Sequence, residues 1–446
     1  MKWNCLFFGI MLCLITPCRA EVQGLVQSDP LIVQSLSQVN ADSISSYIED
    51  LVNCKTRHNL STQSDTNKGI GAATSYLERR CQEFVAKASK NRVKPVVEIV
   101  RYEAGGENTR IGKKVSLPNV MVTLPGSVAT GEIILLAHYD TRVNDNYDGE
   151  TFAPGANDNG SGCACLLEIV RILSQVQLNQ TVRCIFTSGE EHGLWGATHM
   201  AKQAKEKGWP VLAVLNNDMI GNTEASETGL KSNTMVRVFS DSPRGEDSDA
   251  RQLARYIKEM AGVYVPGHEV KLIYRNDRYR RGGDHSPFLQ EGYPAIRISE
   301  YYENYDRTHQ VVREENGIKY GDLLADVDIE YVKRNTQVNM ATVMNLALAP
   351  AEPAKASIAN ANALSNYTVL EYTPVLKADG SVDSTVSYEV LYRETDQSVW
   401  MSYKMCAPAT TSEKQRVSLP ISKDNYFYAV RSVSATGHCS LPRICR

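Results

Sequence analysis

The pattern of hydrophobic and polar positions changes twice along the chain. Residues 31–90 carry apolar side chains at helical spacing, as at Ile32, Leu36 and Val39. From about residue 95 the apolar residues form short runs that are separated by turn residues and are typical of strands, at 97–102, 119–124, 132–138, 182–188, 211–216, 235–240 and 295–299. Several of these runs are apolar at almost every position, which indicates strands that are covered on both faces.

Segments with helical spacing alternate with these strands, at 163–176, 192–207, 249–260 and 330–348. Strands that alternate with helices predict an α/β fold in three layers, α/β/α, with a largely parallel, mixed central sheet. We assign this domain to residues 21–349, with the helical part 31–90 at its start.

The last part of the chain has a different pattern of hydrophobic and polar residues. A Pro-Ala-Glu-Pro-Ala stretch ends the last helical segment, and residues 350–355 are predicted to be a linker. Residues 356–446 contain short β-rich runs at regular spacing, at 367–372, 387–393, 399–403, 416–419 and 426–433. This spacing predicts a small β-sandwich, which we interpret as a fibronectin type III-like module.

The first twenty residues have the form of a secretory signal peptide. Lys2 precedes an apolar run at 6–15, and the simplest cleavage site follows Ala20. The run is too short to span a bilayer, and no later stretch is apolar for long enough to do so. We therefore expect an exported protein, secreted or periplasmic, without a membrane span.

Net charge and cysteine content reduce the number of function classes that the sequence allows. The formal net charge is −3, without the clustered basic excess that a nucleic-acid partner or an anionic membrane surface would require. Eight cysteines follow residue 20, and in an oxidising compartment we expect a Cys54–Cys81 disulfide and a second one between two of Cys406, Cys439 and Cys445. No CxxC motif is present, which disfavours a thiolate zinc site.

Polar, potentially metal-binding residues gather where predicted strands end. The five segments are 138–140 (His-Tyr-Asp), 155–162 (Gly-Ala-Asn-Asp-Asn-Gly-Ser-Gly), 188–193 (Ser-Gly-Glu-Glu-His-Gly), 216–219 (Asn-Asn-Asp-Met) and 305–310 (Tyr-Asp-Arg-Thr-His-Gln). In open α/β sheets, ligands bind beyond the carboxyl ends of the strands, so these side chains can converge on one point. Nitrogen and oxygen donors without thiolate favour a catalytic zinc site.

The donors divide naturally between two zinc ions. If Asp158 bridges them, His138 and Asp218 complete one site, and Glu191 and His309 complete the other. Two Zn²⁺ ions, three carboxylates and a bound hydroxide then sum to zero net charge, which a low-dielectric pocket requires.

Two further acidic residues have predicted roles in catalysis. Glu190 is the predicted general base, which takes a proton from the metal-bridging water. Asp140 is predicted to orient the His138 imidazole.

This set of motifs resembles the secreted di-zinc aminopeptidases of the bacterial leucyl aminopeptidase family, a group of co-catalytic zinc exopeptidases. The resemblance covers roughly residues 90–350, and the motifs occur in the family's order. It implies the same five ligands, Glu190 as the base, Asp140 as the orienting residue and a cis peptide bond between Asp158 and Asn159. The match around His309 is the loosest.

Other candidate residues have simpler interpretations. His285 competes with His309 for the last ligand position, although we favour a structural role for it. His192 is a candidate for a residue that contacts the metal ligands without binding a metal ion itself. We expect Tyr301, Tyr302 and Tyr305 to pack in the core. We expect Arg278, Arg280 and Arg281 to lie in a solvated loop.

The predicted function is that of a secreted, zinc-dependent, monomeric aminopeptidase that acts on peptides with a free N-terminus. A carboxypeptidase or dipeptidase of the same fold is the first alternative; it would need a basic residue, such as Arg281 or Arg297, to bind a C-terminal carboxylate. A one-zinc acyltransferase of the glutaminyl cyclase type is another alternative, but it would not keep all five ligands. A non-catalytic binding protein would have lost ligands or the first glutamate of the pair.

Overall fold

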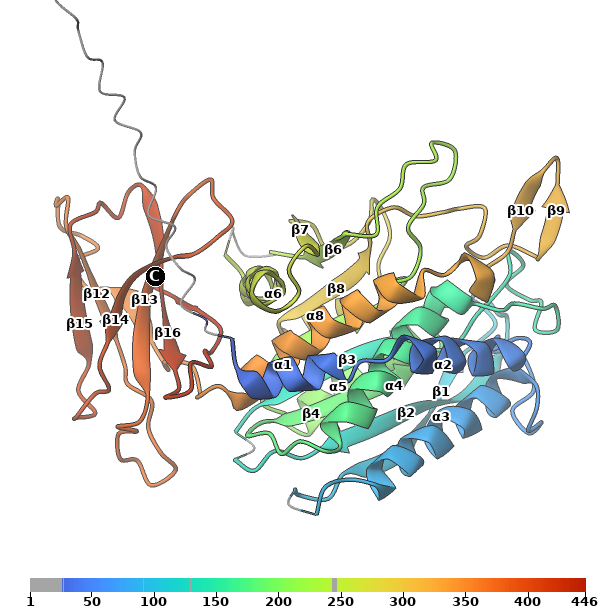
Figure 1. Cartoon of the computed structure of the whole chain (residues 1–446), viewed down its shortest axis with the longest axis horizontal. Helices are drawn as coiled ribbons and strands as arrows, with labels where there is room; N and C mark the ends of the chain where they lie inside the picture. Colours follow the sequence, from blue (N-terminus) through green and yellow to red (C-terminus); the bar gives the residue numbers. More distant parts are fainter. Residues whose placement is uncertain (1–25, 27, 91, 129, 243–246) are drawn as a thin grey trace, which may run out of the picture.

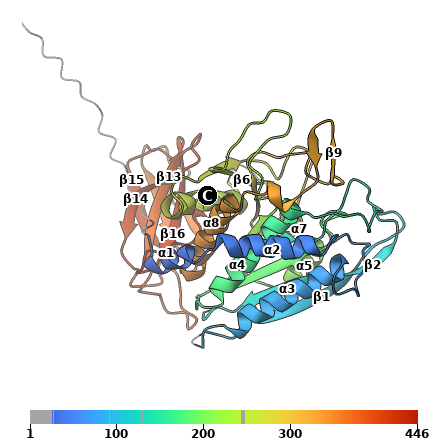
Figure 2. The ribbon, with the colours of Figure 1, turned by 45° about the vertical axis from the view of Figure 1, so that its right-hand side comes forward.

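The structure is a computed structural model that describes residues 26, 28–90, 92–128, 130–242 and 247–446. A larger domain with an eight-stranded sheet lies beside a smaller module built only of strands (Figures 1 and 2). The predicted signal peptide, residues 1–20, lies outside the described residues. In the part of the chain that is described, no helix has the length and apolar character needed to cross a bilayer.

The central sheet has the strand order β1-β2-β4-β3-β5-β8-β6-β7. Strands β4, β3, β5 and β8 are parallel neighbours in its middle, whereas β1, β2 and β6 run antiparallel to their partners toward that middle. The strands are β1 (Val96–Gly105), β2 (Lys114–Leu124), β3 (Glu132–His138), β4 (Thr181–Thr187), β5 (Val211–Asn217), β6 (Met235–Ser240), β7 (Glu269–Ile273) and β8 (Ala295–Glu300). The predicted mixed, largely parallel sheet is therefore confirmed.

Helices cover both faces of this sheet. One face carries α1 (Pro30–Ser37), α2 (Ala41–Asn53), α3 (Gly69–Ala86), α4 (Gly162–Leu173), α6 (Asp249–Tyr264) and α8 (Ile329–Leu348), and the other carries α5 (Trp195–Glu206) and α7 (His285–Gln290). A hairpin of β9 (Arg313–Glu315) and β10 (Ile318–Tyr320) and a short 3₁₀ helix, η2 (Leu324–Asp326), precede α8.

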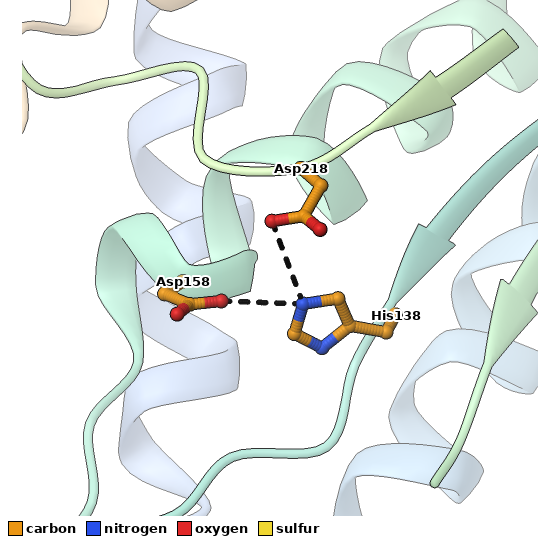
Figure 3. Close-up of side chains that lie close together, drawn as sticks. All are labelled: His138, Asp158 and Asp218. Carbon is orange, nitrogen blue, oxygen red and sulfur yellow. Dashed lines mark ion pairs between the residues drawn. The ribbon is translucent and has the colours of Figure 1, made fainter. Parts of the chain in front are cut away.

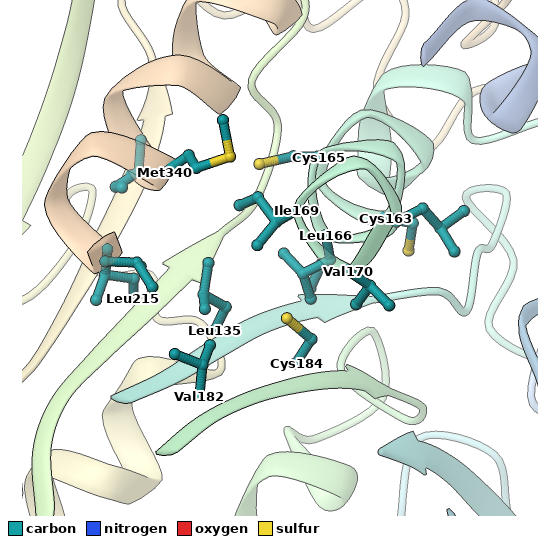
Figure 4. Close-up of a cluster of buried hydrophobic side chains, with 14 of the residues drawn as sticks. Leu135, Cys163, Cys165, Leu166, Ile169, Val170, Val182, Cys184, Leu215 and Met340 are labelled. Atoms are coloured by element: carbon teal, nitrogen blue, oxygen red, sulfur yellow. The ribbon is translucent and has the colours of Figure 1, made fainter. Parts of the chain in front are cut away.

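The central strand β3 shows why its sequence is apolar at successive positions. Leu135 faces the cluster below α4 and α8, whereas Ile134 and Leu136 face the cluster below α5 and α7. Figure 4 shows Leu135 among side chains of α4, with Leu215 of β5 and Met340 of α8 nearby. Both faces of the strand are thus buried, as the continuous apolar run predicted.

The C-terminal module consists of two sheets that share one hydrophobic core. The three-stranded sheet has the order β11-β12-β15 and the four-stranded sheet the order β14-β13-β16-β17. Their bounds are β11 (Ala356–Ile358), β12 (Thr368–Tyr372), β13 (Ser387–Glu394), β14 (Met401–Cys406), β15 (Gln415–Leu419), β16 (Tyr426–Val433) and β17 (Arg443–Ile444). Its relation to the fibronectin type III fold remains a prediction.

Buried and partly buried ion pairs join the module to α6 and to the segment just before it in the larger domain. Arg431 of β16 donates to both carboxylate oxygens of Glu259 at 2.8 and 2.9 Å, and to Glu389 of β13 at 2.7 Å. Arg393 of β13 reaches Asp247 at 2.5 Å. Because desolvated charges are stable only when they are paired, these contacts fix the module against the larger domain.

We expect Arg431→Met to destabilise the protein by about 3–5 kcal/mol, because it leaves the buried carboxylate of Glu389 without its cation. Urea unfolding followed by circular dichroism measures this loss. Arg416→Met in the same module is the matched control: Arg416 is largely exposed and pairs with Glu371 at 2.7 Å, so its loss should change the unfolding midpoint little. Equal effects of the two changes would contradict this account.

The predicted disulfides are wrong: all eight described cysteines are free thiols. The carbonyl oxygen of Cys54 accepts a hydrogen bond from Gly69, the first residue of α3, whereas Cys81 lies twelve residues further along that helix, about 18 Å by the rise per residue. A disulfide needs Cα atoms within about 7 Å.

The C-terminal cysteines are separated in a similar way. Cys406 ends β14, and Cys445 follows β17 at the opposite edge of the four-stranded sheet. Three strand spacings separate those edges, about 14 Å in all. Cys439 packs instead in the core of the larger domain, where its Sγ lies 3.9 Å from the Tyr256 hydroxyl.

Candidate metal centre

The parallel strands in the middle of the sheet bring the predicted ligands together. His138 ends β3, Asp218 directly follows β5, and Glu191 lies in the turn after β4. The His138 Nε2 atom lies 3.2 Å from Asp158 Oδ1 and 3.8 Å from Asp218 Oδ1. Figure 3 shows both carboxylates directed at this one ring nitrogen. These three residues form the first donor group.

Asp158 also belongs to a second donor group. Its other oxygen, Oδ2, lies 3.0 Å from His309 Nε2, and the same nitrogen lies 2.9 Å from the Glu191 carboxylate. Within each group the donor atoms lie within 4.8 Å of one another. The structure therefore places Asp158 between two three-residue groups, with one carboxylate oxygen directed to each.

An irregular turn, η1 (Ala156–Ser161), presents Asp158 at the start of α4. The peptide bond from Asp158 to Asn159 is cis, as the resemblance implied. The buried carboxylate of Asp322 accepts hydrogen bonds from the backbone N–H groups of Asn157 at 2.8 Å and Asp158 at 2.7 Å. Asp322 thereby holds the backbone of Asp158 from a segment that follows the β9–β10 hairpin.

Asp140 contacts the site through two different groups. Its backbone carbonyl lies 3.1 Å from His138 Nδ1, whereas its carboxylate oxygen lies 3.7 Å away. The carboxylate instead accepts hydrogen bonds from the backbone N–H groups of Glu190 and Glu191, both at 3.2 Å, and from Asn59 at 2.9 Å. The residue thus contacts the imidazole through its backbone and positions the glutamate pair through its side chain.

Glu190 lies at the edge of both donor groups. Its carboxylate comes within 4.8 Å of donor atoms of His138 and Glu191. Burial raises the pKa of Glu190 well above its ordinary value, and the carboxylates of Asp218 and Glu191 add to this rise, although His138 opposes it. A glutamate with a raised pKa beside candidate metal ligands has the properties of a proton acceptor.

The five predicted ligand residues form a donor set that fits divalent zinc. Two imidazole nitrogens and three carboxylates are all buried or nearly so; His309 is the most exposed, with 20% of its side chain accessible. Burial alone would lower the pKa of His138, but Glu190, Asp158 and Asp218 together hold it well above its ordinary value. This excess of buried negative charge is the environment that a pair of divalent cations would neutralise.

Two arginines contact the predicted ligands, although the sequence analysis named Arg297 only for the carboxypeptidase alternative and did not name Arg142. The fully buried Arg297 donates to Asp218 Oδ1 at 2.9 Å and lies 3.2 Å from Asp277. Arg142, four residues after His138, donates to Glu191 at 3.0 Å and lies 2.7 Å from His309 Nδ1. Arg297 lies within a strand, so the search for polar residues at strand ends could not assign it to the metal centre. Arg142 follows the His-Tyr-Asp motif closely, and this position could have identified it from the sequence.

The remaining candidates lie behind or beside the donor groups. His285 is buried, with its Nε2 atom 2.9 Å from the carbonyl oxygen of Asn276, and it belongs to neither donor group. His192 Nδ1 lies 2.7 Å from Asn59 Nδ2, behind Asp140. Tyr301 and Tyr302 pack edge to face at 4.8 Å.

The expectation of a solvated arginine loop is wrong for Arg278. Its side chain is only 10% exposed, and it pairs with Asp277 at 3.0 Å and Glu303 at 3.2 Å. Arg281 is 37% exposed and pairs with Glu303 at 3.1 Å. The loop is therefore anchored to the acidic side chain of Glu303.

Comparison with known proteins identifies a family to which this chain is similar. Residues 119–324 match the family model of Peptidase family M28. A probable zinc metalloprotease of Leptosphaeria maculans is 38% identical over 430 residues, which cover 92% of this chain and 96% of the relative.

Solved structures show the same fold at lower identity. The LapA aminopeptidase of Legionella pneumophila superposes with a TM-score of 0.56 at 19% identity, covering 72% of this chain and 76% of that one. The glutaminyl cyclase of Porphyromonas gingivalis superposes with a TM-score of 0.50 at 19% identity, covering 68% and 97%. Since an aminopeptidase and a cyclase share the fold, the fold alone does not distinguish these two activities.

Proposed function

Given that this chain belongs to the zinc metallopeptidases of Peptidase family M28, we propose that it is an aminopeptidase that uses two zinc ions to remove the N-terminal residue of peptides. The observation that carries the proposal is the sharing of Asp158 between two complete donor groups, with Glu190 beside them. His138 and Asp218 would hold one ion with Asp158, and Glu191 and His309 would hold the other.

When bound, the two ions would supply Lewis acidity, which polarises the scissile carbonyl and makes a water molecule more acidic. The residues of the chain then handle the proton. Glu190 accepts it from the attacking water and returns it to the leaving amine, a role that suits a buried carboxylate within 4.8 Å of donor atoms of His138 and Glu191. Asp140 holds the backbone of Glu190 in place through its carboxylate.

The basic side chains near the site bear on the choice between an amino terminus and a carboxyl terminus of the substrate. The two arginines that a carboxypeptidase would use are already paired: Arg297 is fully buried against Asp218 and Asp277, and Arg281 contacts Glu303. These contacts support the aminopeptidase over the carboxypeptidase or dipeptidase.

The cyclase alternative would use one zinc ion. The second donor group, Asp158, Glu191 and His309, would then have no metal to bind, although its atoms already lie within 4.8 Å of one another. The complete second group supports hydrolysis with two ions.

A pair of blocked and free substrates tests the proposed activity. The purified protein, loaded with zinc, is assayed on aminoacyl p-nitroanilides and on their N-acetylated forms, and on N-blocked peptides that have a free carboxylate. We expect cleavage of the free-amine substrates only. Cleavage of the N-blocked peptides would instead establish a carboxypeptidase, and turnover of N-terminal glutaminyl peptides to a cyclic product without hydrolysis would establish a cyclase.

We also propose that the enzyme is exported, on the strength of the apolar run at 6–15 and the cleavage site after Ala20. N-terminal sequencing of protein recovered from outside the cytoplasm should then begin at Glu21. Recovery of the intact N-terminus would contradict export by a cleaved signal.

A further inference from the structure

The loop between α2 and α3 contains an arginine that the family match does not include. Arg57 is 0% exposed and lies outside residues 119–324. Within the described part of the chain, all four side-chain hydrogen bonds of Arg57 go to backbone carbonyl oxygens. Burying a guanidinium group among neutral acceptors costs free energy, so such an arrangement calls for a compensating role.

The acceptors of Arg57 lie on the two segments that carry His138 and Asp158. Its Nε atom donates to the carbonyl oxygen of Tyr139, the residue after His138, at 2.6 Å. Its two terminal nitrogens donate to Pro154 at 2.6 Å and to Gly155 at 2.8 Å, just before the turn that presents Asp158. The planar guanidinium group therefore joins the backbone of one metal-ligand segment to that of the other.

The backbone around Arg57 strengthens this connection. The Arg57 N–H group donates to Thr141 Oγ1 at 3.0 Å, and the Thr141 hydroxyl donates to the carbonyl oxygen of Ala153 at 3.0 Å. Two residues later, Asn59 donates to the Asp140 carboxylate at 2.9 Å. The 55–61 loop thus reaches the segments of His138 and Asp158 and, through Asp140, the glutamate pair.

Gly155 supplies a second, independent observation. Its φ is +52°, and a Cβ atom there would lie 2.8 Å from Arg57 Nη2, 2.2 Å from Thr141 Cγ2 and 2.6 Å from the Asp158 carbonyl oxygen. A side chain at this position would push the guanidinium group away from the turn that presents Asp158. The glycine therefore permits the close approach of Arg57.

From this geometry we infer that Arg57 is a positioning residue that sets the separation of His138 and the shared ligand Asp158. It contacts neither the metal site nor the substrate, and it acts through the backbone of the two segments. The inference rests on the metal site of the proposed function. It assigns a role in metal affinity to the N-terminal helical region, whose helices cover the sheet.

The test uses the full chain and three variants. Arg57→Lys keeps the positive charge but loses the planar guanidinium group. Gly155→Ala leaves Arg57 unchanged but places a Cβ atom against Thr141, the Asp158 carbonyl oxygen and the guanidinium group, so it disturbs the same contact from the other side. Arg92→Lys is the matched control, because Arg92 is also buried and donates to backbone carbonyls, those of Leu173 and Val176, at the end of α4 away from the metal centre. All three changes should lower the thermal unfolding midpoint of the metal-free protein.

Zinc affinity, measured by competition with a chromophoric chelator, distinguishes an effect on the position of the ligands from an effect on the stability of the fold. We expect Arg57→Lys and Gly155→Ala to weaken zinc binding about 10–100-fold, the usual range for residues that orient metal ligands, and to change the absorption spectrum of bound Co²⁺. Arg92→Lys should retain wild-type affinity and spectrum.

Two outcomes would overturn the inference. If the Arg57 and Gly155 variants fold and bind zinc with wild-type affinity and an unchanged Co²⁺ spectrum, Arg57 has only a structural role. If Arg92→Lys weakens binding equally, the effect reflects stability and not position. A wild-type protein that binds no zinc would instead overturn the proposed function, so the two failures are distinguishable.

Discussion

Replacement of Glu190 by glutamine is expected to lower kcat about 10²–10⁴-fold, the usual contribution of a general acid–base residue, while leaving metal binding intact. Glutamine has nearly the same shape but cannot accept the proton from water. Glu190 belongs to neither of the two donor groups that share Asp158, and among the described residues its only possible metal group, with His138 and Glu191, uses residues of those two groups, so we expect its replacement to leave both ions bound. Zinc content by mass spectrometry and kcat on a free-amine substrate measure the two effects on the same sample.

The neighbouring glutamate provides the matched control. Glu191→Gln changes the same functional group on the same turn, but it removes the negative charge of a donor 2.9 Å from His309 Nε2. We expect this variant to lose the zinc ion of the second donor group as well as activity. If Glu190→Gln also lost its zinc, or kept its activity, Glu190 would not be the general base.

The second large effect concerns the shared ligand. Asp158→Asn should abolish tight binding of both zinc ions, because one carboxylate oxygen faces His138 and the other faces His309. An amide cannot offer a negative oxygen to each ion. Isothermal titration of the metal-free protein with zinc measures both the stoichiometry and the affinity.

Asp218→Asn is the comparison for this experiment. Asp218 lies near His138 and belongs only to the first donor group, so one tight zinc site should remain after its replacement. Equal stoichiometry in the two variants would mean that Asp158 is not shared.

The sequence predicted the buried parts of the fold more closely than the exposed ones. Strand β3 was predicted with its observed bounds, because every residue in it is buried and the apolar run is continuous. Strand β7 was missed because it lies at the sheet edge and only one of its five residues is buried. The six-residue helix α7 and the β9–β10 hairpin are too short to show a period.

The residues of the candidate site also differ in how well the sequence could predict them. His138 ends a strand, and Asp218 and the glutamate pair follow strands, so their convergence could be expected from the position of strand ends in an α/β sheet. Arg57 and Asp322 could not be found in this manner. Both come from loops distant in sequence, and their contacts with the backbone around Asp158 exist only in the folded chain.

The most direct test of the central claim is a crystal structure of the zinc-loaded protein with anomalous diffraction data collected on both sides of the zinc absorption edge. We expect two anomalous peaks with the Asp158 carboxylate between them, one beside His138 and Asp218 and the other beside Glu191 and His309. A single peak, or a peak coordinated by His285 in place of His309, would contradict the proposed two-zinc site.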